Sequence, residues 1–148
     1  MAVTQSASAT WQGNLNEGSG TVSTATSDFL RDVPTSWRAR TEEPGNGLTS
    51  PEELLAAAHA SCFSMAFSNQ LAKAGLVAER VEVRVDVTAD KREEGWTVLS
   101  SRITTRAWVP GVDEETFQRC ATNAKDGCPI SRSLKGNIEM SVQATLES

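Results

Sequence analysis

The chain lacks the features that mark nucleic-acid-binding, membrane and secreted proteins. With a formal net charge of −5 over 148 residues it offers no basic stripe for phosphates, so no nucleic-acid partner is expected. No apolar run approaches the roughly eighteen residues of a membrane-spanning helix, so no membrane partner is expected. Residues 1–10 lack the basic and apolar regions of a signal peptide, which predicts a cytoplasmic protein.

Cysteine and histidine are also scarce. Three cysteines, an odd number, argue against a framework of structural disulfides, and a reducing compartment would keep isolated thiols free. A zinc site built from His59 and two cysteines would lack a fourth ligand. A cysteine hydrolase would depend on His59, the only histidine, as its base.

The hydrophobic periodicity predicts a mixture of short strands and helices. Residues 1–9 are expected to form a flexible tail before a single domain over residues 10–148. Strands are predicted over residues 10–15 and 21–26 as a hairpin, then over 36–41, 81–88, 96–109 with a bulge near 100–101, and 138–146. Residues 42–49, which include Pro44, are predicted to form a loop. With two helices between the strands, this order predicts an α+β fold built on antiparallel sheet.

The most strongly marked element is a long helix from Pro51 to about Ala74. Ser50 is suited to the N-cap, and Glu53 completes a capping box. Gly75 supplies the left-handed residue that ends the helix. The middle of this helix is apolar or small nearly all round, which indicates burial on several sides and a partner subunit that helps to cover it.

Two cysteines lie in settings that favour a redox pair. Cys62 lies in the middle of the long helix, and Cys128 lies between Gly127, which can end a second helix over residues 113–126, and Pro129, which can begin another. A helix N-terminus favours a thiolate, so Cys128 suits a resolving or leaving thiol in disulfide exchange.

The third cysteine and the histidine are expected to pack. Cys120 lies on the apolar stripe of the second helix, beside Phe117, Ala121 and Ala124. His59 lies one turn before the cysteine of the long helix, and a lone histidine there is more often buried and hydrogen-bonded than catalytic.

If Cys62 is a nucleophile, it needs a cation from elsewhere. A free cysteine titrates at about 8.5, and Cys62 lies too far along its helix to benefit from the helix dipole. Arg38 and Arg40 project from the same face of the predicted strand before the helix, and periodicity does not choose between them. Glu52 lies about 15 Å along the axis from Cys62 and about 80° around it. If Glu52 serves the same site, we expect it to do so from a second chain of a two-fold dimer.

Five segments of the chain carry a family resemblance. They are residues 11–13 (WQG), 18–24 (GSGTVST), 50–54 (SPEEL), 57–65 (AAHASCFSM) and 127–131 (GCPIS). Together they resemble the OsmC/Ohr family of osmotically inducible and organic-hydroperoxide-resistance proteins, over nearly the whole chain. The WQG opening and the AAHA run favour the OsmC branch.

The resemblance implies an OsmC-like fold, in which antiparallel sheets wrap around a long central helix within an intertwined homodimer. It also implies a thiol peroxidase of oxidative and osmotic stress defence, which reduces organic hydroperoxides, and hydrogen peroxide more weakly, without metal, haem or flavin. By position, Cys62 is the peroxidatic cysteine and Cys128 the resolving one. Arg40 is the arginine that stabilises the thiolate, Arg38 stays open as an alternative, and Glu52 orients the guanidinium, from its own or the partner chain.

The resemblance further implies that an external dithiol, such as a lipoyl-type donor, restores both thiols. We expect Trp37, Phe63 and Met65 to form an apolar pocket that favours alkyl peroxides over hydrogen peroxide. The alternative function is that of a redox-sensing or small-ligand-binding protein of the same fold. Such a protein would form the Cys62–Cys128 disulfide without fast turnover of peroxide.

Overall fold

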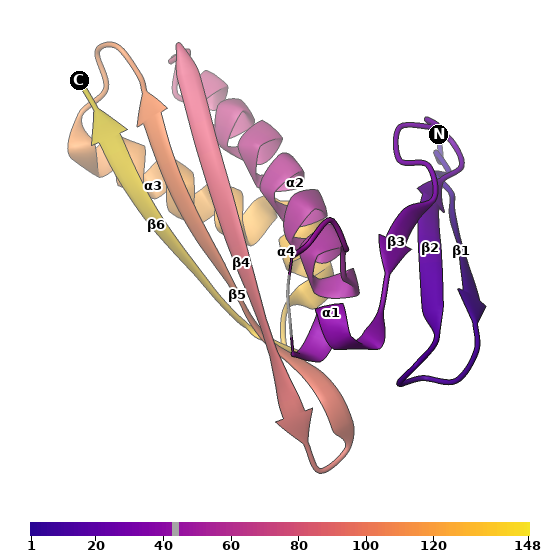
Figure 1. Cartoon of the computed structure of the whole chain (residues 1–148). Helices are drawn as coiled ribbons and strands as arrows, with labels where there is room; N and C mark the ends of the chain where they lie inside the picture. The colour runs from indigo at the N-terminus through magenta and orange to yellow at the C-terminus, as the bar shows by residue number, and fades with distance from the viewer. Residues whose placement is uncertain (43–44) are drawn as a thin grey trace. The chain divides into compact units, whose positions relative to one another are not determined.

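A computed structural model of the protein describes residues 1–42 and 45–148, which form two compact units, Met1–Leu54 and Leu55–Ser148. The elements are β1 (Ala7–Gln12), β2 (Ser19–Thr24), β3 (Val33–Thr35), α1 (Trp37–Thr41), α2 (Pro51–Lys73), β4 (Arg80–Arg92), β5 (Gly95–Trp108), α3 (Glu114–Gly127), α4 (Pro129–Leu134) and β6 (Glu139–Glu147) (Figure 1). The predicted α+β class is confirmed. The loop predicted for residues 42–49 includes residues 43 and 44, which lie outside the described residues.

The first unit contains a three-stranded antiparallel sheet in the order β1-β2-β3. The predicted hairpin is confirmed, but its first strand begins at Ala7, which pairs with Thr24, three residues earlier than predicted. Residues 7–9 therefore belong to the sheet, and the predicted tail is too long by that much. Backbone pairing with β2 explains the extension, since all six residues of β1 are exposed and show no buried face that a sequence pattern could reveal.

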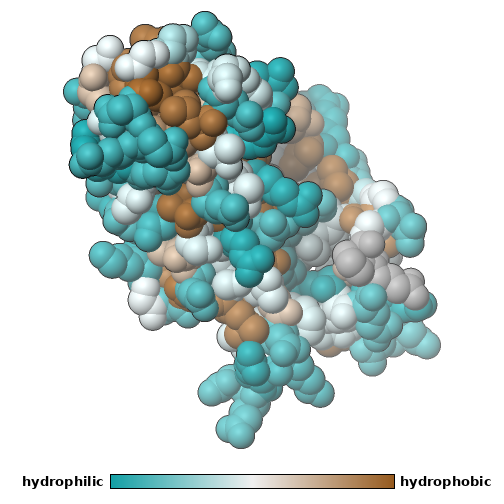
Figure 2. All heavy atoms as spheres, turned by 90° about the vertical axis from the view of Figure 1, so that its left-hand side faces the viewer, coloured by the Kyte–Doolittle hydropathy of each residue, from teal (hydrophilic) through white to brown (hydrophobic). Residues whose placement is uncertain are grey.

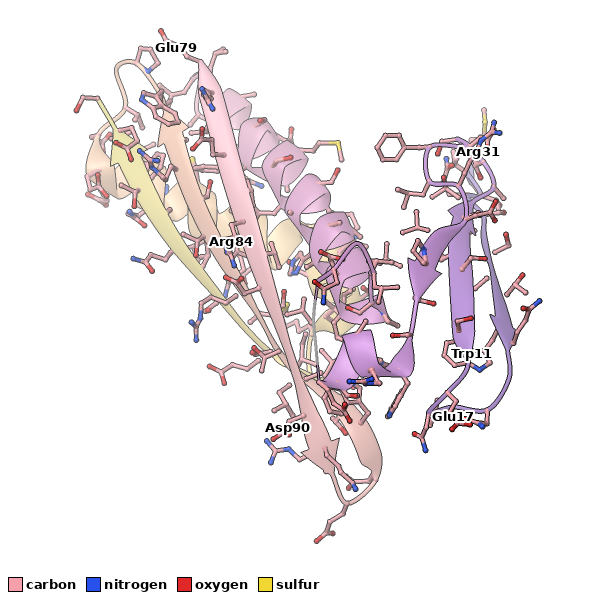
Figure 3. All side chains as sticks on the ribbon, in the orientation of Figure 1. Trp11, Glu17, Arg31, Glu79, Arg84 and Asp90 are labelled. Carbon is pink, nitrogen blue, oxygen red and sulfur yellow. The ribbon has the colours of Figure 1, made fainter. Side chains whose placement is uncertain are left out.

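The side chain of Trp11 lies near the turn that carries Glu17, and its position explains the glycine at position 20 (Figure 3). Trp11 Nε1 donates a hydrogen bond to the carbonyl oxygen of Gly13 at 3.1 Å. A Cβ added at Gly20 would lie 2.8 Å from a ring carbon of Trp11 and 2.7 Å from the carbonyl oxygen of Thr10. Position 20 therefore requires glycine, because any side chain would displace the indole or the neighbouring strand.

The segment predicted as a third strand is a helix instead. Strand β3 ends at Thr35, and Ser36 caps α1 by accepting a hydrogen bond from the backbone N–H of Ala39 at 3.0 Å. The N-cap hydroxyl is the physical reason for the difference, because it satisfies a backbone donor that a strand would have paired. Residues two apart on a helix point about 160° from each other, so Arg38 and Arg40 do not share one face.

Helix α2 confirms the prediction closely at both ends. The backbone N–H of Glu53 donates to Ser50 Oγ at 3.1 Å, and Gly75 adopts a φ of 76° after the last turn. The Glu53 carboxylate accepts a hydrogen bond from Thr49 Oγ1 at 2.6 Å, a partner outside the predicted capping box. In the single chain one stripe of the helix is fully buried, whereas Met65 is 65% exposed. Burial by a partner subunit stays a prediction.

The second unit contains a sheet in the order β4-β5-β6. Strands β4 and β5 form a long antiparallel hairpin, and a bulge at Leu99 lies beside the predicted position. Strand β6 pairs with β5 in parallel, so the prediction of an antiparallel sheet throughout is wrong for this pair. The chain passes through α3 and α4 between these strands, and such a crossover returns it in the same direction.

Helices α2 and α3 cover one face of this sheet (Figure 1). The buried core comprises Phe63, Phe67 and Leu71 of α2, Ile103, Ala107 and Val109 in or just after β5, and Phe117, Cys120, Ala121 and Ala124 of α3. Phe67 and Phe117 meet edge to face with ring centroids 5.4 Å apart. This contact is part of the core packing that sets which face of α2 is buried.

The other face of the sheet is charged. Arg84 projects from β4, and its guanidinium pairs with Asp86 at 2.7 Å (Figure 3). Figure 2 shows hydrophilic residues broken by separate apolar patches on one side of the molecule. Within residues 1–42 and 45–148, no helix is long and apolar enough to cross a membrane.

Candidate active site

Two cysteine side chains meet although they lie 66 residues apart in the sequence. Cys62 projects from the middle of α2 and is partly exposed, whereas Cys128 is fully buried between the end of α3 and the start of α4. Their Sγ atoms lie 2.6 Å apart. Because the S–S bond of a disulfide is about 2.05 Å long, the two sulfurs can be joined with little movement of either helix.

The position of Cys128 depends on the two residues that flank it. The backbone N–H of Cys128 donates to the carbonyl oxygen of Ala124 at 2.9 Å and closes the last turn of α3, which ends at Gly127. Pro129 then occupies the first turn of α4, where its missing N–H costs nothing. The predicted end and start of helix on either side of Cys128 are therefore both confirmed.

The surroundings of Cys62 favour its protonated thiol form. Burial raises the pKa of the Cys62 thiol, and the hydrogen bond that it shares with Cys128 raises that pKa further. The backbone N–H of Ile130, in the first turn of α4, acts in the opposite direction by stabilising a thiolate at Cys62. The direction that prevails is upward, so a further positive charge is needed before Cys62 becomes a thiolate at neutral pH.

His59 is packed and hydrogen-bonded, as predicted. It is fully buried, and its Nδ1 and Nε2 atoms each lie 2.7 Å from a serine hydroxyl, Ser101 Oγ on β5 and Ser131 Oγ on α4. Burial lowers the pKa of His59 below its ordinary value, which favours the neutral imidazole.

Arg40 and Glu52 form a bidentate ion pair within the first unit. Arg40 Nε donates to Glu52 Oε1 at 3.0 Å and to Oε2 at 3.1 Å, and Arg40 Nη2 donates to Oε1 at 2.8 Å. The guanidinium also lies 5.6 Å from the centroid of the Trp37 ring. The two side chains are 28% and 10% exposed, so the pair is largely shielded from water. These contacts leave the guanidinium with a defined orientation.

Arg38 has different surroundings. It pairs with Glu42 at 3.4 Å, and both of these side chains are more than half exposed. The Arg40–Glu52 pair forms within one chain, so the pairing itself needs no partner subunit. It belongs to the first unit, whereas the Cys62–Cys128 pair belongs to the second.

An apolar groove of about 310 Å³ surrounds the guanidinium in the first unit. Its lining residues are Trp11, Leu15, Thr35, Ser36, Trp37, Arg40 and Pro51. Trp37 was among the residues expected to line an apolar pocket. Trp11 and Leu15 escape sequence analysis because they lie in and after β1, far from Arg40 in the sequence.

A second groove, of about 480 Å³, opens beside Cys62 in the second unit. It is lined by Cys62, Met65, Ala66, Asn69, Gln70, Lys73, Gly127 and Pro129. Met65 lies at this groove as expected, but Phe63 does not, because it is fully buried in the core. One step along a helix turns a side chain by about 100°, enough to move Phe63 from the groove to the core.

Cys120 packs in the core at 4% exposure, as predicted. In the described part of the chain, no three His, Cys, Asp or Glu side chains lie close enough together to hold a metal ion.

The serines that bond His59 and the Ile130 N–H were missed by the sequence analysis. Ser101 shares the inward face of β5 with Ile103 and Thr105, so its place in the alternation was a usable signal. Ser131 lies three residues after Cys128, which places both on nearly the same side of α4. No sequence pattern indicates that His59 joins these two serines.

Comparison with known proteins places the chain among relatives of one family. The family described as OsmC-like protein matches residues 44–143. Peroxiredoxin OsmC of Escherichia coli is 38% identical over 143 residues, covering 97% of this chain and 98% of that protein. The organic hydroperoxide resistance protein OhrA of Bacillus subtilis is 31% identical over 103 residues, covering 64% of this chain and 66% of that protein.

Solved structures show the same fold. An organic hydroperoxide resistance protein from Elizabethkingia anophelis superimposes with a TM-score of 0.76 at 23% identity, covering 99% of this chain and 100% of that one. An OsmC-like protein from Mycoplasma pneumoniae gives a TM-score of 0.74 at 16% identity over the whole of both chains. With the family match over most of its length and the higher identity to OsmC than to OhrA, the chain belongs to the OsmC family and lies nearer to its OsmC branch than to its Ohr branch.

Proposed function

We propose that the protein is a thiol-dependent peroxidase that reduces organic hydroperoxides, and hydrogen peroxide more weakly, in oxidative and osmotic stress defence. The observation that carries the proposal is the 2.6 Å separation of the Cys62 and Cys128 Sγ atoms. The names of the relatives, peroxiredoxin OsmC and organic hydroperoxide resistance protein, support the same activity.

In the first step the Cys62 thiolate attacks the terminal oxygen of the hydroperoxide. An S–O bond forms, the O–O bond breaks, and the alkoxide takes up a proton and leaves as an alcohol. The sulfur is oxidised to sulfenic acid and the peroxide is reduced. In this proposal Arg40 supplies the positive charge that lowers the pKa of Cys62 and stabilises the charge on the departing oxygen.

In the second step Cys128 attacks the sulfenic acid of Cys62. The Cys62–Cys128 disulfide forms and hydroxide leaves, which the proton of the Cys128 thiol converts to water. An external dithiol of the lipoyl type then reduces this disulfide to two thiols and is itself oxidised to a disulfide. These reaction steps require no metal or organic cofactor.

In the proposed enzyme two chains form a homodimer, in which the Arg40–Glu52 pair of one chain serves Cys62 of the other. Ten residues of helix separate Glu52 from Cys62 in the sequence, a rise of about 15 Å, which favours action across two chains. Glu52 holds the guanidinium at both carboxylate oxygens, so that the charge keeps its orientation as the peroxide binds.

The groove around Arg40 supports a preference for organic substrates. Trp11, Leu15 and Trp37 offer apolar surface beside one cation, which suits a molecule with an alkyl tail and a polar peroxide group. Hydrogen peroxide has no apolar part that would gain from this surface. Equal kcat/KM for both peroxides would contradict the assignment of this groove.

The test is the consumption of tert-butyl hydroperoxide and hydrogen peroxide with dithiothreitol as reductant. Turnover should vanish in Cys62→Ser, whereas Cys120→Ser, which alters a thiol in the core, should stay active. Disulfide formation without turnover above the dithiothreitol background would instead favour a redox sensor of the same fold.

A further inference from the structure

His59 ties together three elements that surround the cysteine pair. Its ring lies on α2, and its two nitrogens reach Ser101 on β5 and Ser131 on α4, each at 2.7 Å. All three side chains are at most 1% exposed. A neutral imidazole has one donor and one acceptor nitrogen, and a hydroxyl can be either, so both bonds are satisfied whichever nitrogen carries the proton. The network is therefore complete without water.

The His59–Ser131 hydrogen bond and the Cys62–Cys128 contact both join α2 to the start of α4. On α2, His59 and Cys62 are three residues apart, and so are Cys128 and Ser131 at the start of α4. His59 meets Ser131, whereas Cys62 meets Cys128, so the two segments run in opposite directions. Residues three apart lie on nearly the same side of a helix, so the His59–Ser131 hydrogen bond lies directly beside the Cys62–Cys128 contact.

We propose that His59 is a positioning residue whose hydrogen bond to Ser131 holds α4 against α2 and thereby keeps Cys128 within reach of Cys62. Helix α4 has only six residues, and isolated helices of that length are not stable in water. Its place therefore depends on contacts with its neighbours. The inference rests on the proposed function only in taking Cys62 and Cys128 as the reacting pair.

The bond to Ser101 supplies a matched control. It has the same length, uses the same ring, and ends on an equally buried serine, but β5 carries neither cysteine. Ser131→Ala removes the tether of α4, whereas Ser101→Ala removes a bond of the same kind that does not involve α4. A residue that served only to stabilise the fold would make the two substitutions equivalent.

The effective concentration of one thiol toward the other measures positioning directly. When the reduced protein equilibrates with glutathione disulfide, an S–S bond forms between Cys62 and Cys128, and the glutathione disulfide is reduced to two glutathione molecules. The equilibrium constant of this exchange has units of concentration, and it falls when the two sulfurs are held together less well. No peroxide and no enzymatic turnover enter the measurement.

The experiment titrates the wild type, Ser131→Ala and Ser101→Ala with mixtures of reduced and oxidised glutathione, and quantifies the Cys62–Cys128 disulfide by alkylation and mass spectrometry. Ser131→Ala should lower the effective concentration about three- to tenfold, the factor expected for one lost hydrogen bond. Ser101→Ala should stay within about twofold of the wild type while losing a similar amount of unfolding free energy.

An equal fall in both variants, or no fall in Ser131→Ala, would overturn the inference. Urea unfolding of each variant establishes that the compared proteins are folded, and serine-to-alanine changes avoid the larger cavity that His59→Ala would leave. Loss of peroxidase turnover in the wild type would overturn the proposed function alone, because the glutathione equilibrium would still distinguish Ser131 from Ser101.

Discussion

Replacing Glu52 by glutamine tests whether the Arg40–Glu52 pair orients the guanidinium for the reaction. The substitution keeps the size of the side chain, removes its charge and converts one acceptor oxygen into an NH₂ donor. Arg40 Nε contacts both carboxylate oxygens, so this donor would face an N–H in either amide orientation. Hydrogen bonds to charged groups contribute about 1.5–3 kcal/mol. Because Arg40 is 28% exposed and water can replace part of the loss, we expect the free energy of unfolding to fall by about 1–2 kcal/mol.

The effect on activity should be larger than stability alone explains. A guanidinium released from its clamp keeps its charge but loses its orientation, and we expect kcat/KM for tert-butyl hydroperoxide to fall about 10- to 30-fold, or about 1.4–2 kcal/mol of transition-state stabilisation. Glu53→Gln is the matched control, since it alters the neighbouring carboxylate, which is exposed and bonded to Thr49. It should stay within about twofold of the wild type.

The assay measures initial rates with dithiothreitol at a temperature where urea titrations show each variant to be folded. Equal activity of Glu52→Gln and Glu53→Gln, whether both stayed active or both lost activity, would refute the role of Glu52 in orienting the Arg40 guanidinium. Arg40→Lys adds a second comparison, because lysine keeps the charge without the planar fork. If Arg40→Lys were as active as the wild type, a point charge would suffice and the bidentate geometry would have no catalytic role.

Three further predictions address the cysteines, the dimer and the histidine. With one equivalent of peroxide and no reductant, the wild type should form the disulfide, whereas Cys128→Ser should leave a Cys62 sulfenic acid that dimedone traps; mass spectrometry without that adduct would contradict the resolving role. Co-expressed Cys62→Ser and Arg40→Met chains, each inactive alone, should recover about a quarter of wild-type activity if sites form across a dimer, because random assortment makes half of the dimers mixed and each mixed dimer has one complete site; no recovery would contradict this. The unfolding free energy should fall as pH drops below about 6.5, because burial lowers the pKa of His59 and the unfolded chain takes up the proton first. Urea titrations at several pH values measure this fall, and an equal dependence of the unfolding free energy on pH in His59→Gln would contradict the assignment to His59.

The parts of the fold that could be predicted are those set by neighbouring residues. Helix α2 begins and ends at residues whose side chains or backbone freedom act locally, Ser50 and Gly75. The stripe of α3 similarly reflects its buried face, and the alternation of β4 reflects the partly buried valines that pack against the core. The helix break on either side of Cys128 follows from the glycine and proline beside it. In each case a few adjacent residues contain the whole physical reason.

The parts that could not be predicted depend on distant or competing contacts. Residues 36–41 offered a plausible strand alternation, and the hydroxyl of Ser36 decided for a helix by capping Ala39. The helix turns Arg38 and Arg40 to different sides, whereas the strand pattern placed them on the same face and did not choose between them. The direction of β6 depends on how the chain returns through α3 and α4, because side-chain alternation is the same in parallel and antiparallel strands. The partners of His59 lie 42 and 72 residues away, beyond any local pattern.

The electrostatics of Cys62 explain why the proposed mechanism needs a cation. Burial and the shared hydrogen bond with Cys128 both raise the pKa of the Cys62 thiol, and the Ile130 N–H offsets only part of that rise. A thiol held in this way resists oxidation until a positive charge approaches it. In the proposed enzyme that charge is the Arg40 guanidinium, which lies in an apolar groove suited to an alkyl hydroperoxide. The substrate and the cation would then reach the Cys62 sulfur together. The thiol would lose its proton when a peroxide binds and would stay protonated when none is bound.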